Sequence, residues 1–237
     1  QLTRYLATAR VSKHRLFVWV SSPVLPDCQL IVLVRSDDFF FGVLHSRVHE
    51  LWALGLGTRL EDRPRYTPTT CFETFPMPEA SPEHAEAIGK AARRLNELRE
   101  NWLNPPELTR EEILEFPAAL DGPWRRFVTN PDDRGIGTAR WSRRVARAGD
   151  AEKLVKKRTL TNLYNQRPAW LDQAHRALDE AVLAAYGLPF DIGDDDLLAA
   201  LLDLNQSRPA VEPSATTTTE DESLDDDEDQ DPGDDME

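Results

Sequence analysis

The chain has 237 residues and a formal net charge of −14, and its length suffices for one or two domains with a hydrophobic core. It has no apolar run of the roughly 18 residues that a membrane span requires, its first residues lack a signal-peptide pattern, and it begins at Gln1 rather than Met, so we expect part of a longer polypeptide. Its two cysteines, Cys28 and Cys71, favour a reducing compartment over a disulfide scaffold or a metal motif, and we expect a cytoplasmic protein.

The first expected unit, residues 1–78, combines strands with a helix. Two apolar runs rich in Val and Ile, residues 15–20 and 29–34, predict buried strands that a short loop joins. Residues 40–57 then predict one helix, because apolar side chains recur at helical spacing and Gly55 and Gly57 supply its end. Residues 58–78 predict an extended segment that is basic at its start.

The second expected unit, residues 79–211, is mainly helical. Ser81 predicts a helix cap with Pro82 in the first turn. Thr109 and Glu112 have the spacing of a capping box and predict a short helix. Further helices are expected from about Ala151, from Pro168 to Gly187, and at residues 194–205.

Two segments of the chain are expected to lack regular structure. Glycines and prolines between residues 117 and 150 predict a basic, irregular insertion in the helical unit. Residues 212–237 hold 13 Asp and Glu and no Lys or Arg, which predicts a disordered acidic tail. The fold class expected is therefore α+β: a small mixed α/β segment, a mainly α-helical domain and a disordered tail.

The tail conceals the charge of the remaining chain. Without it, 29 acidic and 28 basic residues leave a net charge of −1, and residues 121–170 hold 12 basic residues against 5 acidic ones. Acidic runs are usually solvated ends that keep a protein soluble. The alternative interpretation is that the tail competes with other molecules for the protein's own basic surface.

Several catalytic patterns are absent from the sequence. The chain has two G-x-G pairs, at residues 55–57 and 135–137, and neither has the context of a cofactor-binding turn. The residues Asn104, Pro105 and Pro106 approach the Asn-Pro-Pro-aromatic motif of amino-methyltransferases, but Glu107 replaces the ring that stacks on a flipped base. Because two prolines after a helix typically end it, we interpret this stretch as a structural stop.

Two histidines are candidates for a metal site. His45 and His49 are four residues apart on one predicted helix, a spacing that suits metal ligands. Two ligands do not close a site, and no cysteine or third histidine is near them in the sequence. We therefore expect these side chains to pack and to form hydrogen bonds.

Basic side chains are the features that indicate a function. One cluster precedes the first predicted strand, a second follows the helix that ends near Gly57, and a third runs from Arg134 to Arg158 with Trp141 within it. Arginines on loops beside small polar residues suit phosphates and guanine edges. A solvated surface has the same composition, so composition alone does not establish nucleic-acid binding.

Three blocks resemble a known family. They are RYLATARVSKHRLFVWV, FFFGVLHSRVHELWALGLGTRLEDRPRYTPTTCFETFPMP and KKRTLTNLYNQRPAWLDQAHRALDEAVLAAYG. They are similar to the C-terminal part of single-chain, adenine-specific DNA methyltransferases of the MmeI type, which act in restriction–modification and phage defence. The resemblance implies that residues 1–78 are the end of a target-recognition domain and residues 79–211 a helical C-terminal domain.

The resemblance also implies that catalysis and DNA binding belong to different parts of the complete enzyme. The complete enzyme would methylate adenine N6 with S-adenosylmethionine, which an upstream catalytic domain would bind, and this chain would bind double-stranded DNA with no metal of its own. The expected DNA contacts are Arg4, Lys13, His14, Arg15, Arg59, Arg65 and Tyr66. Pairing of Arg59 or Arg65 with a nearby acid is the alternative for those two. A DNA-specificity subunit without catalytic function and a protein-interaction module are alternatives for the whole chain.

Overall fold

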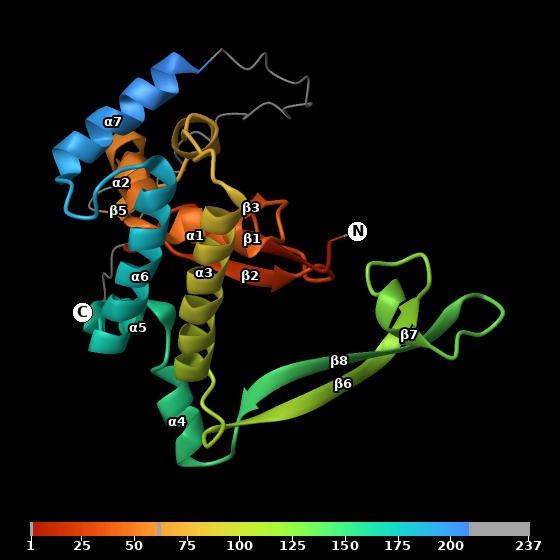
Figure 1. The fold of residues 1–237 in the computed structure, drawn as a ribbon. Helices are drawn as coiled ribbons and strands as arrows, with labels where there is room; N and C mark the ends of the chain where they lie inside the picture. Colours follow the sequence, from red (N-terminus) through yellow and green to blue (C-terminus); the bar gives the residue numbers. More distant parts are fainter. Residues whose placement is uncertain (1, 61–62, 209–237) are drawn as a thin grey trace, which may run out of the picture.

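The computed structural model describes residues 2–60 and 63–208, and the acidic tail predicted at residues 212–237 lies outside the described residues. A small sheet and several helices form a body, and a long β-ribbon projects away from it (Figure 1). The α+β class is confirmed, because small antiparallel sheets accompany a larger set of helices.

The N-terminal sheet has three antiparallel strands in the order β2-β1-β3. They are β1 (Arg4–Ala9), β2 (Phe17–Ser21) and β3 (Leu30–Leu33). The two predicted strands exist, but each pairs with β1, which the sequence did not predict, and neither pairs with the other. Neither is buried throughout, because β3 buries alternate residues and β2 fully buries only Phe17.

Two helices follow the sheet where one was predicted. They are α1 (Asp38–His45) and α2 (Arg47–Leu56), and they meet at Ser46, whose backbone is extended at φ −76° and ψ 157°. The Ser46 side chain accepts a hydrogen bond from the backbone of His49 at 3.5 Å, so it caps α2. Serine competes with helical hydrogen bonds in this way, which explains the break.

The predicted extended segment is a short hairpin followed by a helical turn. The hairpin pairs β4 (Thr58–Leu60) with β5 (Arg63–Arg65). Pro68 then starts a single turn of π-helix, η1 (Pro68–Phe72), so the expectation of extended structure is wrong over that turn.

The predicted helix boundaries in the second half are largely confirmed. Helix α3 (Pro82–Leu103) starts at the Ser81 cap, and Asn104 ends it, as the interpretation of a structural stop required. Helix α6 (Ala169–Tyr186) lies between Pro168 and Gly187, whose φ of 69° suits glycine. The other helices are α4 (Asp150–Lys156), α5 (Leu160–Gln166) and α7 (Asp194–Ser207).

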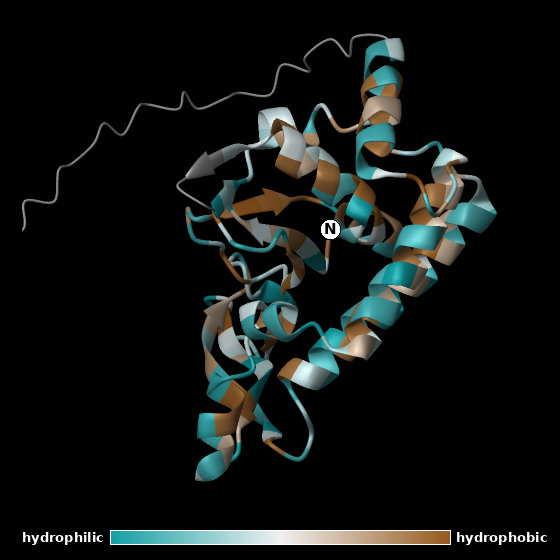
Figure 2. Ribbon diagram, turned by 90° about the vertical axis from the view of Figure 1, so that its left-hand side faces the viewer, coloured by the Kyte–Doolittle hydropathy of each residue, from teal (hydrophilic) through white to brown (hydrophobic). Residues whose placement is uncertain are grey.

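One hydrophobic core unites these elements. Helix α3 packs against α1 and α6, and α7 packs against α2. Buried side chains from both sides of residue 78 belong to the same cluster, including Leu6, Phe17, Trp52, Leu95 and Leu178. The helices alternate between hydrophilic and hydrophobic bands in Figure 2, because one face of each lies against this core.

Helix α1 approaches its neighbours closely at Gly42. A Cβ atom at this position would lie 2.7 Å from Ile88 Cγ2, 3.0 Å from Ala92 Cβ and 3.2 Å from Leu178 Cδ1. The lack of a side chain at Gly42 is therefore what lets α1 pack this tightly on α3 and α6.

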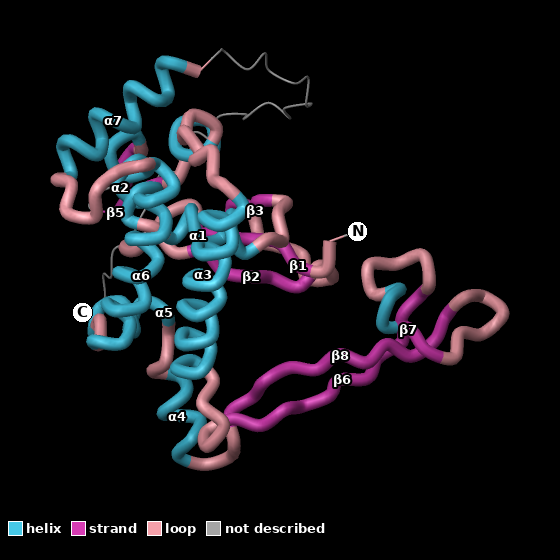
Figure 3. The backbone as a smooth tube through the Cα atoms, in the orientation of Figure 1, coloured by secondary structure: helices cyan, strands magenta, loops and turns pink. Residues whose placement is uncertain are grey.

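The largest difference from the sequence-based expectation is a β-ribbon, which we call the β-arm, at residues 109–146. It pairs β6 (Thr109–Ala119) with β8 (Ile136–Ala146), and β7 (Val128–Thr129) adds a short third strand (Figure 3). The predicted helix at Thr109 and the irregular insertion at 117–150 are therefore wrong over these strands. Glu112 does not close a capping box, because its carboxylate pairs across the ribbon with Arg143 at 2.7 Å.

The tip of the β-arm has a small core of its own. The 3₁₀ turn η2 (Arg125–Phe127) brings Trp124 and Phe127 against the strand residues Phe116 and Trp141. Their ring centroids lie 5.0 to 5.9 Å apart in edge and tilted contacts, which are favourable arrangements for aromatic rings. These contacts stabilise a ribbon that would be marginal on its own.

Candidate nucleic-acid interface

The β4–β5 hairpin exposes basic side chains at the surface of the body. Arg63 and Arg65 on β5 are exposed. The backbone of β5 is fixed to the loop after β1, because Ser12 N donates to Pro64 O at 3.3 Å and Tyr66 N donates to Arg10 O at 2.8 Å. The hairpin and this loop therefore form one surface. The side chain of Arg59, predicted as a contact, lies outside the described residues.

Gly57 allows the chain to turn tightly into the hairpin. A Cβ atom there would lie 2.4 Å from Ala53 O and 3.1 Å from Arg65 O. Any larger residue would have to displace the backbone of α2 or β5, so this glycine sets the position of Arg65.

Lys13 and His14 lie on the loop beside the hairpin. Lys13 Nζ donates to Asn165 Oδ1 at 2.8 Å, and His14 Nε2 lies 2.9 Å from the same oxygen. Both predicted contacts are therefore near the surface and attach the loop to α5.

Arg15 and Tyr66 are buried, and they support the hairpin from the interior of the protein. The Arg15 side chain donates to Thr8 Oγ1 at 3.0 Å and to Pro64 O at 3.1 Å, and its guanidinium lies 4.9 Å from the centre of the Tyr66 ring. Burial lowers the pKa of Arg15 and raises the pKa of Tyr66. The pair joins the sheet to the hairpin from the inside, away from any surface-bound molecule.

Arg4 is held against the sheet and α1. It donates to Asp38 Oδ1 at 2.7 Å and to Ser36 O at 3.0 Å, and its guanidinium lies 3.7 Å from the centre of the Trp19 ring. Arg4 is thus separate from the surface that the hairpin and Lys13 form.

The two candidate metal-ligating histidines are core residues, as predicted. His49 Nε2 lies 3.1 Å from Tyr66 Oη and its Nδ1 lies 3.0 Å from Leu44 O. Burial lowers the pKa of His49 to about 3 and holds the pKa of His45 well below its ordinary value. Within residues 2–60 and 63–208, no group of three or more His, Cys, Asp and Glu side chains is placed to hold a metal ion.

Arg99 is a buried cation that sequence reasoning missed. It is 2% exposed and donates to His45 Nε2 at 2.8 Å and to Phe17 O at 3.0 Å, but its Nε has no hydrogen-bond partner. A signal was available, because Arg99 continues the apolar stripe of α3 four residues after Leu95. A basic residue on such a stripe indicates either a buried polar contact or a functional site.

A polar cavity of about 140 Å³ lies behind the loop of His14. It is lined by three histidines, three arginines, Tyr164, Leu16 and the two acids Glu50 and Asp179. Burial raises the pKa of Asp179 to about 6, although its carboxylate accepts a hydrogen bond from Arg47 N at 2.7 Å. Because the arginines already have partners elsewhere, this cavity connects the sheet to α5 and α6 and has no free anion-binding group.

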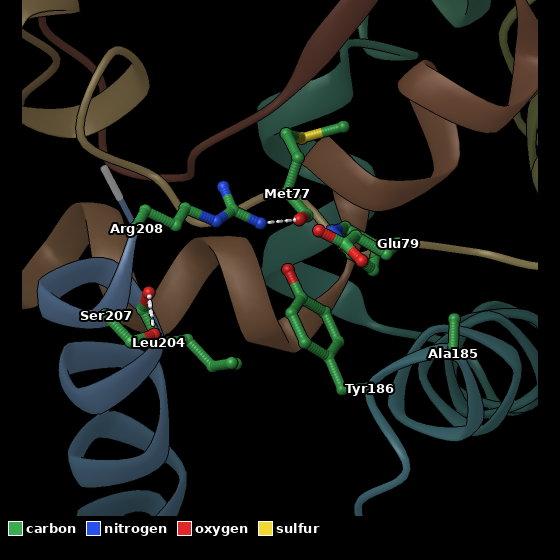
Figure 4. Close-up of a pocket in the computed structure, with 8 residues that line it drawn as sticks. Met77, Glu79, Ala185, Tyr186, Leu204, Ser207 and Arg208 are labelled. Carbon is green, nitrogen blue, oxygen red and sulfur yellow. Dashed lines mark hydrogen bonds between the residues drawn. The ribbon is translucent and has the colours of Figure 1, made fainter. Parts of the chain in front are cut away.

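A second hollow, of about 370 Å³, lies where α6, α7 and the segment before α3 meet (Figure 4). Met77, Tyr186 and Leu204 supply its apolar lining, and Arg208 donates to Met77 O. It contains none of the predicted contacts and lies at the end of the described chain.

Further basic side chains are on the β-arm and α4. Strand β8 carries Arg140, Arg143 and Arg144, and α4 carries Lys153 and Lys156. No described helix combines the length and apolarity needed to cross a lipid bilayer.

Comparison with known proteins finds a family model that matches the segment containing the hairpin. Residues 8–79 match the family model of the MmeI target recognition domain. A segment of 71 residues is 32% identical to DNA methyltransferase A of Bacillus subtilis (strain 168), covering 30% of this chain and 8% of that protein.

The fold is similar to that of the type IIL restriction–modification enzyme MmeI, whose structure was solved in complex with DNA. The TM-score is 0.56 at 21% sequence identity, and the match covers 86% of this chain and 21% of that enzyme. The chain therefore spans only a small part of the length of either relative.

Proposed function

We infer that this chain, whose residues 8–79 form a target recognition domain of the MmeI type, is the C-terminal DNA-recognition part of a site-specific adenine N6 DNA methyltransferase. It binds double-stranded DNA in the cytoplasm and positions the target adenine. An upstream methyltransferase domain, in the same polypeptide or a separate subunit, binds S-adenosylmethionine and transfers the methyl group. The helices between residues 82 and 207 pack on the recognition unit and support it, and the β-arm projects from them.

One observation carries this inference. The family match at 8–79 includes the β4–β5 hairpin, and the structure exposes Arg65 on that hairpin beside the loop of Lys13. Exposed arginines on a rigid hairpin suit both phosphate contact and the reading of guanine edges in the major groove.

The predicted contacts take different parts in this proposal. Lys13, His14 and Arg65 lie at or near the surface and contact the duplex, whereas Arg15 and Tyr66 hold the hairpin in place from the interior. Arg59 is proposed as a contact from its position on β4, opposite Pro64.

Salt-dependent binding to duplex DNA tests the proposal. The full chain and a chain ended after Arg208 are titrated with duplex between about 50 and 200 mM salt, and affinity is expected to fall steeply as salt rises. Arg65→Ala is expected to weaken binding, whereas Arg94→Ala, an exposed arginine on α3, is not.

Absence of duplex binding by both chains at low salt contradicts the proposal. That result favours a protein-interaction module. Binding by the chain ended after Arg208 but not by the full chain supports competition by the acidic tail.

A further inference from the structure

The two long strands of the β-arm carry opposite charges. Strand β6 carries the acids Glu111, Glu112 and Glu115, whereas β8 carries Arg140, Arg143 and Arg144. Two cross-strand ion pairs, Arg140–Glu115 at 2.9 Å and Arg143–Glu112 at 2.7 Å, neutralise part of this charge. In the strand register each of these arginines therefore stands opposite one of the acids, Arg144 opposite Glu111 included, and the basic side chains lie along β8.

The basic side chains continue beyond the ribbon into α4. Residues 136–158 hold 8 basic and 2 acidic side chains. Three of the basic residues, Arg144, Lys156 and Lys157, are exposed, and no carboxylate of the described residues forms an ion pair with them, although Arg144 stands opposite Glu111 in the strand register. Helix α4 contacts β8 at the base of the β-arm, so we call these three residues the β8–α4 surface (Figure 1).

The dimensions of the β-arm suit a duplex. Its long strands have 11 residues each, which at about 3.3 Å per residue gives a length of about 36 Å. This is close to one helical turn of duplex DNA, about 34 Å. The β-arm is thus long enough to follow a duplex for about one turn.

Charge on the strands disfavours a protein strand as the partner. Neither β6 nor most of β8 is paired along its outer edge, and such edges attract other strands unless charged residues prevent it. Arginines along β8 and glutamates along β6 oppose that pairing. Phosphates, by contrast, complement unpaired Lys and Arg side chains directly.

We propose that the β8–α4 surface is a second DNA contact, which binds the sugar–phosphate backbone of the duplex independently of base sequence. This inference rests on the proposed function and adds to it a DNA-binding surface outside the recognition hairpin. The β8–α4 surface neutralises phosphates, and the hairpin of Arg65 supplies the sequence-dependent contacts.

The test compares two triple variants of the full chain that change net charge equally. The first, Arg144→Gln/Lys156→Gln/Lys157→Gln, removes the β8–α4 surface. The control, Lys90→Gln/Arg94→Gln/Arg176→Gln, removes three exposed charges from α3 and α6. Binding to a duplex of about three helical turns is measured by fluorescence anisotropy over a series of salt concentrations.

The first variant is expected to lose up to about three units of the slope of log affinity against log salt, because each lost phosphate contact removes about 0.9. The loss is expected on duplexes of unrelated sequence, and the control is expected to keep the wild-type slope.

Equal loss in both variants, or loss in neither, overturns the inference. If neither loses slope while wild-type chain still binds duplex, the proposed function stands without this contact, and a protein partner for the β-arm becomes the better explanation. If the wild-type chain does not bind duplex, the proposed function itself fails. Circular dichroism on both variants confirms that the fold is intact.

Discussion

At the scale of single residues, the main finding is that buried polar groups hold the sheet, α1 and α3 together. Arg99 NH1 and Phe17 N both donate toward His45 Nε2, at 2.8 and 2.9 Å. The same nitrogen also lies 2.8 Å from Phe17 O, so the Arg99 side chain and both polar groups of the Phe17 backbone meet at His45. A buried arginine that donates to a neutral histidine makes a contact that requires both side chains.

Substitution of Arg99 tests this arrangement. Arg99→Ala is expected to lower the free energy of unfolding by about 3 kcal/mol, because it leaves a cavity and removes the donor to Phe17 O. Arg99→Met keeps the volume and removes a desolvated charge, so its cost is expected to be clearly smaller. Urea denaturation of both variants measures the difference, and equal costs would contradict the packing explanation.

The buried histidines predict that stability falls in acid. The pKa of His49 is about 3, that of His175 is about 4 and that of His45 is also lowered, all mainly by burial. Below the unfolded pKa of about 6.5 the unfolded chain binds protons that the folded chain does not, so stability is complete above that pH and is lost as pH falls. Asp179, with its pKa raised to about 6, opposes this trend.

The expected loss is on the order of 1 kcal/mol per pH unit below 6.5 for each uncompensated histidine. Denaturation midpoints between pH 7.5 and about 4.5 measure it. Asp179→Asn removes the opposing group and is expected to steepen the loss. A stability that does not change over this range would show that the histidines are not neutral in the fold.

At the scale of elements, the sequence predicted helix ends, which depend on nearby residues, but it did not predict the pairing of strands that are distant in the sequence. Ser81, Pro168 and Gly187 marked helix boundaries correctly, because capping depends on residues within one turn. The β-arm was missed because β6 is defined by its partner β8, whose register is set far away in sequence. The Thr109–Glu112 spacing suited a helix cap equally well, and the cross-strand pair with Arg143 decided the outcome.

Two buried glycines on facing helices offer a matched test of helix packing. Gly42→Ala is expected to destabilise the protein by about 1–3 kcal/mol, because the new methyl would overlap Ile88 and Ala92. Gly89→Ala is expected to be neutral or to stabilise by up to about 1 kcal/mol, because its nearest neighbour is the flexible end of Arg93 at 3.3 Å. Thermal unfolding of both variants checks the contrast, and equal destabilisation would refute it.

The β-arm is expected to be dispensable for the stability of the body. Its base is closed by the pair Arg110 and Val145, so residues 111–144 can be replaced by an Asn-Gly turn. The melting temperature of the body is expected to change little, because the body's main contacts with the β-arm within the described residues are those of α4 with β8 and of Arg126 with Leu2 O. A large loss of stability would show that the β-arm belongs to the core.

At the scale of the whole molecule, the site was only partly predictable. The sequence identified the basic residues of the hairpin region, but burial separated Arg15 and Tyr66 from Lys13 and Arg65, and no local pattern encodes that separation. The sequence also did not predict that one core spans residue 78, because this core depends on how α3 packs against α1.

The chain alone is expected neither to bind S-adenosylmethionine nor to transfer a methyl group. Its G-x-G stretches lie at the end of α2 and in the tip of the β-arm, where no strand leads into a cofactor-binding helix. Isothermal titration calorimetry and a methyl-transfer assay on duplex DNA measure both properties. Tight cofactor binding would contradict our proposal that an upstream domain binds S-adenosylmethionine.

Because the β-arm is long and its base is narrow, a small rotation at the base produces a large displacement of the tip. A rotation of about 10° at the base would move a tip about 36 Å away by about 6 Å. The hydrogen bond from Arg126 to Leu2 O restrains that rotation. A pair of fluorophores, one at the tip and one on α6, would therefore convert a small angular change at the base into a measurable change of distance.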